Sequence, residues 1–540
     1  MKIDIVFESR TMDFISDDEV REFRESGQFD EQWYVDQYPD VKIVGVDPAR
    51  HFLWIGAKLG RRPSRDANKS TVHFATSDGG AFEQPRRGGF RGALDRLQRA
   101  LNYRAISKIL TPELRLKIAE SALFDEQYYQ LHYHDRIEDR DDLVADYISC
   151  FARDPDRDPG PLFSTRFYSA THADVKDVHP FIHYVQYGMD EGRAAFSSEK
   201  VNAYISESLG IVLNDFSEIV PLCREVHIFC WEEGNFFFTD IAHYIGQLLS
   251  ERGHRVAVRT DSPEPGNDDV LNMVVAPHEY CALGPGRHWT DGQYADAVYV
   301  NTEQWQTSWF ALSLKYMRRS RVGVLDLNPS SAQGLARMGF KAGFLPLLPL
   351  PGSCFDFSQH RDLSEHVTRL KFVDPLTYPD RFENRTYDIV CCGVLNERRS
   401  KALAGTARIL SEHRCFLHVP RFNRPIRPGH PDVLSAEDIA QLTRNTKIML
   451  NIHQGDSHYL EWHRIFLIGM MQGAVVVSEP CYANSYVQPD VHYIESSVEN
   501  MGSVLSTLLS TDTGRRKLAY IHENTIKLRD SIMNGERLIR

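Results

Sequence analysis

No stretch of this sequence is apolar over the roughly 18 residues that a membrane-spanning helix needs. The first residues, MKIDIVFESRTMDF, also lack the apolar core of a secretory signal peptide. Both absences predict a soluble protein, and they leave room for a peripheral contact at the inner face of a membrane.

Cysteine is sparse and scattered. The chain has 9 cysteines, and two of them, Cys391 and Cys392, are adjacent within an apolar stretch. This spacing forms neither a disulfide framework nor a CxxC metal-binding pair. We therefore expect reduced thiols and a cytoplasmic location.

Charge of one sign is not in large excess, since 62 Lys and Arg residues stand against 74 Asp and Glu residues, for a net charge of -12. A mildly acidic chain that is 42% hydrophobic has an ordinary globular composition, so we expect no nucleic-acid partner. A chain of 540 residues exceeds a single hydrophobic core and should form about three domains.

The first third of the chain contains a degenerate repeat. The segments FDEQWYVDQYPDV, from Phe29, and FSTRFYSATHADV, from Phe163, are each followed by a stretch that ends in Gly-Arg. A partial copy, FDEQYYQLHYHD, begins at Phe124 and has no Gly-Arg ending. Repeated units of this kind predict a helical accessory domain over residues 1–215.

Each full copy carries signals for a short pair of helices. Asp30 and Ser164 occupy N-cap positions, and Gly60 and Gly192 suit helix C-termini. The aromatic residues of the copies are interpreted mainly as core residues, with direct acceptor binding as the alternative; they are Trp33, Tyr34, Phe167 and Tyr168.

The second domain, predicted over residues 220–366, begins with a strand, a helix and a strand at residues 226–230, 239–251 and 256–259. This start is Rossmann-like but lacks GxGxxG, which disfavours a dinucleotide site. Further buried strands are predicted at residues 273–276, 297–301, 322–325 and 342–345. Each ends in a polar turn, so polar groups should collect at one edge of a sheet.

The third domain, residues 367–540, repeats the alternation. Strands are predicted at residues 388–393, 415–422, 447–453 and 474–479. Helices are predicted from Ser400, over residues 435–445 and 460–472, and over most of the chain after Met501. The expected fold class is therefore α/β, with two Rossmann-like doubly wound domains preceded by a mainly α-helical repeat domain.

Over residues 222–509 this arrangement resembles the GT-B glycosyltransferases, and more loosely the group that includes glycosyltransferase family 4. The repeats resemble the accessory repeats found beside glycosyltransferase domains in bacterial polysaccharide-synthesis proteins. The resemblance implies that the C-terminal Rossmann-like domain binds a nucleotide-sugar donor and the N-terminal one binds the acceptor. The expected acceptor is a glycan, a lipid-linked glycan or a protein, and the repeats either position it or form a homo-oligomer.

Donor-binding residues are predicted at the turns of the third domain. Basic side chains at a helix start oppose the helix dipole unless an anion arrives, which favours a diphosphate at GVLNERRSK. The resemblance implies that Glu461 contacts the ribose, and Arg464 shares its helix face and can reach a phosphate. The full predicted donor set is Gly393, Arg398, Arg399, Lys401, Asn451, His453, Glu461, Arg464, Ser478 and Glu479.

Family 4 members usually carry the motif E-x7-E. Counted from Glu461, the second glutamate would fall on Gly469, so this motif is broken. The stereochemical outcome, retaining or inverting, therefore stays open.

The acceptor side should supply a general base if the transfer inverts the anomeric carbon. The candidates at strand exits are Glu233, His278 and Glu279, with Glu232 and Asp240 nearby. Predicted acceptor contacts are Glu232, Asn235, Glu303 and Trp305, the last by stacking on a sugar ring. No metal and no cofactor beyond the nucleotide-sugar substrate is expected, because Arg, Lys and helix N-termini can stabilise a leaving diphosphate.

Two other classes of function remain open at this point. One is a non-catalytic GT-B-like protein that binds a glycan or a protein partner. The other is an NAD-dependent or nucleotide-dependent epimerase or dehydrogenase, which the missing glycine-rich motif disfavours.

Overall fold

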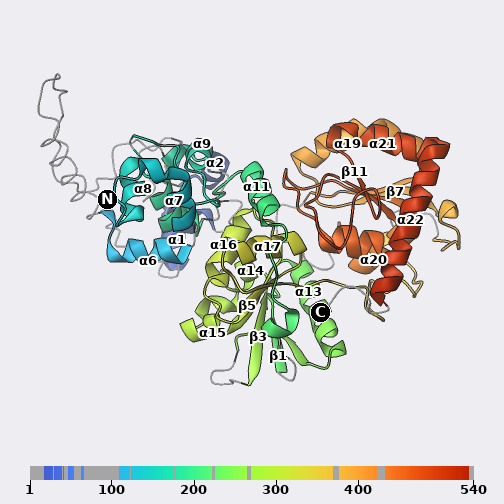
Figure 1. Ribbon diagram of the computed structural model, residues 1–540, viewed down its shortest axis with the longest axis horizontal. Coiled ribbons are helices and arrows are strands. Elements are labelled where there is room, and N and C mark those ends of the chain that lie inside the picture. The colour runs from blue at the N-terminus through green and yellow to red at the C-terminus, as the bar shows by residue number, and fades with distance from the viewer. Residues whose placement is uncertain are drawn as a thin grey trace, which may run out of the picture. The chain divides into compact units, whose positions relative to one another are not determined.

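The computed structural model divides the chain into two compact units, Met1–Phe196 and Ser197–Arg540 (Figure 1). It describes residues 17–27, 29–38, 41, 47–53, 63–65, 109–121, 123–151, 153–175, 178–191, 193–221, 225–263, 269–368, 376–421 and 432–533. Within those ranges, no helix combines the length and the apolarity required to cross a bilayer. The eight cysteines that fall in them are free thiols.

The first unit is helical in its described part. Its helices are α1 (Asp17–Glu25), α2 (Glu31–Gln37), α4 (Pro48–His51), α6 (Pro112–Ser121), α7 (Glu126–Tyr133), α8 (Leu143–Cys150), α9 (Thr165–Thr171) and α10 (Pro180–His183). The predicted N-caps Asp30 and Ser164 are confirmed, because their side chains accept the backbone N–H of Trp33 and Phe167. Gly60 and Gly192, predicted at helix C-termini, lie outside the described residues.

One buried tyrosine occupies the same place in each of the three copies. The hydroxyl of Tyr34 lies 3.0 Å from His51 Nδ1, and that of Tyr168 lies 3.0 Å from His183 Nδ1. In the middle copy, Tyr129 donates instead to Asp146 Oδ2 at 2.8 Å. The hydroxyl therefore keeps a polar partner on the second helix of each pair even where the histidine is replaced.

The same backbone hydrogen bond closes each copy. The N–H groups of Asp30, Asp125 and Ser164 donate to the carbonyls of Pro63, Pro159 and Ala195, each at 2.9 Å. An arginine lies two residues before each of these carbonyls in the sequence: Arg61, Arg157 and Arg193. The middle copy, predicted to lack its Gly-Arg ending, thus keeps the arginine, and the pattern was missed because Asp156 replaces the glycine.

The second unit begins with α11 (Ser198–Ser208) and α12 (Phe216–Ile219) and contains two parallel sheets. The strands of the first sheet are β1 (Glu225–Phe229), β2 (Arg255–Arg259), β3 (Val270–Val275), β4 (Ala297–Asn301), β5 (Gly323–Asp326) and β6 (Ala342–Phe344). They lie in the order β2-β1-β3-β4-β5-β6. The longer helices between them are α13 (Phe236–Glu251), α16 (Ser308–Met317) and α17 (Pro329–Arg337); the short ones are α14 (Pro277–Tyr280) and α15 (Asp291–Ala295).

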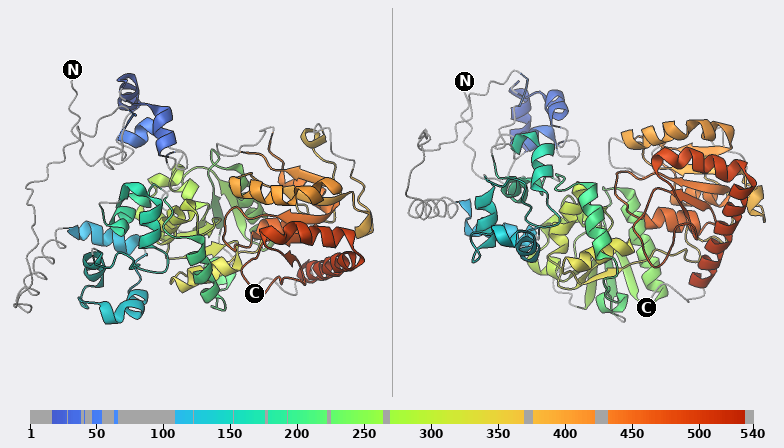
Figure 2. Two further views of the ribbon diagram at one scale, coloured as in Figure 1. Left: turned by 90° about the horizontal axis from the view of Figure 1, so that it is seen from above. Right: turned by 45° about the horizontal axis from the view of Figure 1, so that its top comes forward.

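The strands of the second sheet are β7 (Tyr387–Cys392), β8 (Cys415–His418), β9 (Thr446–Asn451), β10 (Val475–Ser478) and β11 (Ile494–Glu495). Their order is β11-β10-β9-β7-β8. Figure 1 shows α19 (Glu397–Glu412) and α21 (Val498–Ser510) on one face of this sheet and α20 (Ala436–Arg444) on the other. Seen from above, the orange α19 and the red α21 lie over the strands, and α22 (Asp512–Met533) follows α21 (Figure 2).

The predicted fold class is confirmed: the chain has two doubly wound parallel sheets after a helical region. Each predicted strand overlaps an observed one, and β4 has the predicted bounds. Three helices differ from their predictions. The helices expected from Thr239 and from Ser400 begin three residues earlier, at Phe236 and Glu397. The helix expected at residues 460–472 is a π-helix, η8 (His463–Met470).

The two halves of the second unit share one hydrophobic core, which includes Ile228 of β1, Trp462 and Val476 of β10. Hydrogen bonds also join the halves. Asn328 Nδ2 donates to the carbonyl of Leu460 at 2.7 Å, and Trp462 Nε1 donates to the carbonyl of Leu347 at 3.0 Å. The halves therefore form one packed body, and a cavity between them has defined walls.

In both sheets the strand order reverses next to the first strand, between β1 and β3 and between β7 and β9. Open α/β sheets bind ligands outside the carboxyl ends of strands at such a reversal. The fold therefore predicts ligand binding at the turns after β1, β3, β7 and β9.

Candidate functional site

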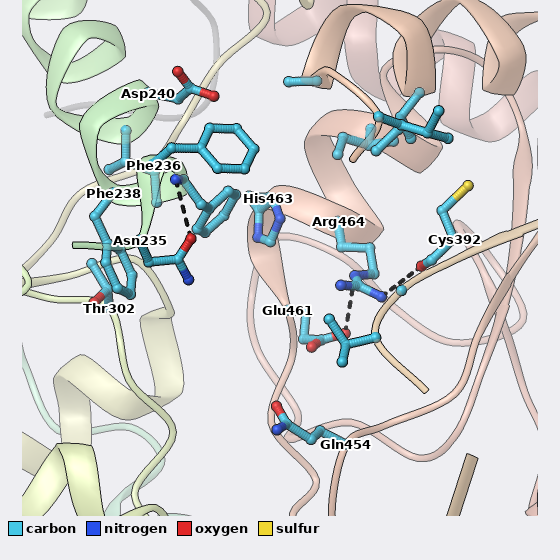
Figure 3. Close-up of a pocket in the computed structure, with 18 of the residues that line it drawn as sticks. Asn235, Phe236, Phe238, Asp240, Thr302, Cys392, Gln454, Glu461, His463 and Arg464 are labelled. Atoms are coloured by element: carbon cyan, nitrogen blue, oxygen red, sulfur yellow. Dashed lines mark hydrogen bonds and ion pairs between the residues drawn. The ribbon is translucent and has the colours of Figure 1, made fainter. Parts of the chain in front are cut away.

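A cavity of about 360 Å³ lies between the two halves of the second unit, at these strand ends (Figure 3). Its polar lining in the first half includes Asn235, Asp240, Thr302, Glu303 and Gln304. In the second half it includes Gly393, His418, Gln454, Glu461, His463 and Arg464. Most of the remaining wall is apolar, as in small-molecule sites generally.

Two arginines lie over Gly393 at the end of β7. Arg464 donates from Nη1 to the carbonyl of Cys392 at 2.8 Å, and Arg399 donates from Nε to the carbonyl of Ile452 at 2.8 Å. A Cβ at position 393 would lie only 2.7 Å from Arg464 Nη1. Glycine is therefore needed here so that the guanidinium group can rest against the backbone.

The two guanidinium groups repel each other. Burial, and then the charge of Arg464, lower the pKa of Arg399. A bound anion would relieve this repulsion and could accept hydrogen bonds from Arg464 in the cavity wall.

Glu461 is the counter-ion within this cluster. Its Oε1 lies 3.9 Å from Arg399 Nη2, and its Oε2 lies 3.5 Å from Arg464 Nε. Burial by itself would raise the pKa of Glu461, but the charges of Arg464 and Arg399 lower it overall. Among the described residues, no group donates a hydrogen bond to its buried Oε2, so Glu461 can accept one from a ligand hydroxyl.

Arg398 and Lys401, both predicted donor contacts, do not line this cavity. Arg398 donates from Nη1 and Nη2 to the two oxygens of Glu479, at 2.8 and 2.5 Å, and from Nε to Asp456 at 2.7 Å. Lys401 is exposed and pairs with Glu397 at 2.7 Å. The structure thus commits the Arg398 guanidinium to protein partners instead of directing it at a phosphate.

The other predicted donor residues form a buried polar cluster at the ends of β9 and β10. Asn451 Nδ2 donates to Ser478 Oγ at 3.0 Å, and the backbone N–H of His453 donates to Glu479 at 2.7 Å. Asn451, His453, Ser478 and Glu479 are all buried and lie outside the cavity lining. They tie two strand ends together beside the arginines.

The predicted acceptor side contains carboxyl groups with strongly shifted pKa values. Burial raises the pKa of Glu279 to about 7, although its Oε2 accepts the backbone N–H of Asn235 at 2.9 Å. Burial and the charge of Glu279 raise the pKa of Glu303 to about 8. Of these two, Glu303 lines the cavity and Glu279 lies behind it.

The remaining predicted residues of this side lie elsewhere. His278 is buried, and burial lowers its pKa to about 3, so its ring is neutral. Glu232 and Glu233 are exposed on the turn after β1 and do not line the cavity.

Trp305 differs most from its prediction. Its side chain is only 1% exposed, it stacks on Phe310 with ring centroids 4.5 Å apart, and it donates to Ser331 at 2.6 Å. The indole is thus a core residue and has no face for a sugar.

The sequence interpretation missed an aromatic wall at the start of α13, formed by Phe236, Phe237 and Phe238. Figure 3 shows Phe236 and Phe238 on the α13 side and His463 and Arg464 on the opposite side. Three successive residues of one helix cannot all face the protein core. The run of three phenylalanines was therefore the signal in the sequence that one or more of them faces a ligand site.

The absent second glutamate of E-x7-E has a steric reason. A Cβ on Gly469 would overlap the Cγ2 methyl of Val476 on β10. The π-helix and the strand are in contact at this point, so no glutamate fits there without rearrangement.

Asn202 of α11 holds the loop beside the arginines. It donates to the carbonyl of Asp456 at 3.0 Å and accepts from the N–H of His458 and the hydroxyl of Tyr482, at 3.0 and 2.7 Å. Loop 454–458 thus depends on a helix far away in sequence.

Asn202→Ala is expected to speed amide hydrogen exchange in residues 454–458 by roughly 5–30-fold, since about 1–2 kcal/mol of hydrogen bonding is lost. Asn214→Ala removes one exposed hydrogen bond, to Glu218, and is the matched control. Equal exchange in the two variants would show that the loop is held by other contacts.

No group of three or more His, Cys, Asp or Glu side chains in the described ranges is arranged to hold a metal ion.

No family model matches the sequence, and no curated protein matches it either.

Solved structures to which the chain is similar include Anabaena Alr3699/HepE in complex with UDP, at 12% identity and a TM-score of 0.32, covering 58% of this chain and 99% of that one. They also include an alpha-glucosyltransferase in complex with UDP and a 13-mer DNA, at 10% identity and a TM-score of 0.33, covering 57% and 96%. A third is an alpha1,3-fucosyltransferase, at 9% identity and a TM-score of 0.30, covering 63% and 97%. Likenesses of this extent say nothing of what this chain binds.

Proposed function

We propose that this protein is a glycosyltransferase that moves a hexosyl or deoxyhexosyl group from a nucleotide-diphosphate sugar to a glycan, lipid-linked glycan or protein acceptor. One observation supports this most directly. The strand ends of two doubly wound sheets meet at one cavity, with Arg464 and Glu461 on one wall and the carboxyl groups of Asp240 and Glu303 on the other. The wider role proposed is synthesis of bacterial surface polysaccharide or glycoconjugate, in the cytoplasm or at the inner face of the membrane.

In this proposal the arginine wall binds the donor. Arg464 and Arg399 oppose the charge of the diphosphate, which grows as the sugar leaves, and no metal is needed for this. Glu461 accepts a ribose hydroxyl with its Oε2, to which no described group donates a hydrogen bond. The first half then presents the acceptor hydroxyl across the cavity, beside Thr302 and Glu303.

Binding of a panel of nucleotides tests the proposal first. Thermal unfolding is measured with UDP, GDP, dTDP and NAD, and stabilisation by at least one nucleoside diphosphate but not by NAD is expected. Release of that diphosphate from UDP-glucose, GDP-mannose or dTDP-glucose is then measured. Binding without release from any donor would favour a non-catalytic binding protein, and stabilisation by NAD alone would favour a dehydrogenase or epimerase.

A further inference from the structure

The Glu303 side chain lines the cavity and contacts polar side chains of the protein. Glu303 lies two residues after the end of β4, its side chain is 16% exposed, and Thr307 Oγ1 donates to its Oε2 at 3.4 Å. Its Oε1 lies 3.6 Å from Nε2 of the buried His278. His278 Nδ1 lies 3.1 Å from Ser313 Oγ, so Ser313 holds the imidazole ring that lies against this carboxyl.

The segment that carries Glu303 reaches the donor wall. The next residue, Gln304, donates from Nε2 to Glu461 Oε1 at 3.5 Å, across the two halves. The other carboxyl in the lining of this half, Asp240, lies on α13, at the far end of the wall from Glu461 in Figure 3. Glu303 is therefore the cavity carboxyl that stands beside the proposed donor site.

We propose, on the basis of the proposed function, that Glu303 is the general base that takes the proton of the acceptor hydroxyl. The freed electron pair of that oxygen forms the bond to the anomeric carbon. The bond from that carbon to the diphosphate oxygen breaks, and its electron pair leaves with the nucleoside diphosphate, opposite Arg464. The acceptor oxygen, deprotonated by a base on the acceptor side, attacks the anomeric carbon from the face opposite the leaving group, so the anomeric configuration inverts.

The surroundings tune Glu303 for this role. Burial and Glu279 raise its pKa to about 8, close to a working pH, where a general base is most effective. The titratable groups that interact with it are His278 and Glu279 of α14 and Tyr459 before η8. His278 is a positioning residue here, since it is buried and neutral and does not line the cavity.

Glu303→Gln tests the assignment. With UDP-glucose, GDP-mannose and dTDP-glucose as donors, and water or p-nitrophenyl glycosides as acceptors, kcat is expected to fall about 10²–10⁴-fold while KM for the donor changes less than threefold. The rise of wild-type activity as the pH passes about 8, where Glu303 loses its proton, should disappear in the variant. The wild-type product should have the inverted anomeric configuration. Glu251→Gln, which alters an exposed carboxyl at the end of α13 outside the cavity lining, is the matched control and should change kcat less than threefold.

Stability at different pH values provides an independent check of folding. A carboxyl whose pKa is raised from an ordinary 4.5 to about 8 stabilises the folded state below about pH 4.5 and loses this contribution as the pH rises through 8. The Tm of Glu303→Gln, relative to wild type, should therefore be higher at pH 9 than at pH 5.

Two results would overturn the assignment of Glu303 and leave the proposed function intact. In the first, the wild-type enzyme turns over a donor and kcat of Glu303→Gln stays within tenfold of the wild-type value. In the second, the wild-type product retains the anomeric configuration. A wild-type protein that turns over no donor would overturn the proposed function, and this assignment with it.

Discussion

Arg464→Ala is expected to lower kcat/KM for the nucleotide-sugar donor by about 10²–10³-fold, the usual effect of removing one preorganised donor of positive charge or hydrogen bonds. The reason lies in the geometry over Gly393. Arg464 is held by the Cys392 carbonyl and by Glu461, and it lines the cavity. Without it, Arg399, which is more deeply buried, is the arginine of this pair that remains to oppose the growing charge of the leaving diphosphate.

The measurement is steady-state release of nucleoside diphosphate, with nucleotide binding followed separately by calorimetry. Arg464→Lys should recover little, because one ammonium group cannot both hold the Cys392 carbonyl and reach a phosphate as a guanidinium fork does. The control is Arg408→Ala, an exposed arginine on α19 that pairs with Glu412. If Arg464→Ala stays within threefold of that control, the donor does not bind at this wall.

Arg157→Ala is expected to destabilise the first unit by about 3–5 kcal/mol, the usual cost of leaving a buried charge without its partner. Arg157 Nη1 donates to Tyr129 at 2.9 Å and to Asp146 at 3.3 Å, and its Nη2 donates to the carbonyl of Arg136 at 2.9 Å. Both Arg157 and Asp146 are buried. The substitution leaves the buried carboxylate of Asp146, in the middle repeat copy, without the cation that neutralises it.

Calorimetry of the full-length protein should show this as a lower temperature for one transition, since units of a multidomain chain need not unfold together. Arg153→Ala is the matched control: it lies four residues earlier, is exposed, and pairs with Glu138, so its loss should cost no more than about 1 kcal/mol. Equal effects of the two substitutions would mean that the buried pair contributes little to this unit.

Strands were the most predictable part of the fold. All five residues of β4 are buried, and the first four form the apolar run AVYV that is expected of a strand covered on both faces. The π-helix was not predictable, because its apolar pattern is also that of an α-helix. The arginine of the middle copy was hidden because the expected glycine is absent.

Only those features of the site that depend on residues close together in the sequence could be predicted. Placing Arg464 and Glu461 on one wall needed only their spacing of three residues on one turn. The fate of Arg398 depended on Glu479, a residue 81 positions away, and that of Trp305 depended on Phe310 and Ser331. Whether a polar or aromatic side chain serves a ligand or its own fold is decided by such distant partners, which one sequence does not reveal.

The contact of Gly469 with Val476 constrains the order in which this site could change. A glutamate introduced at position 469 first would meet the methyl group of β10, so that single step would damage the fold before it could add a function. A smaller residue at position 476 would have to come first, and it would leave a cavity until the second step followed. The E-x7-E arrangement is thus separated from this protein by an intermediate of lowered stability, whichever change occurs first.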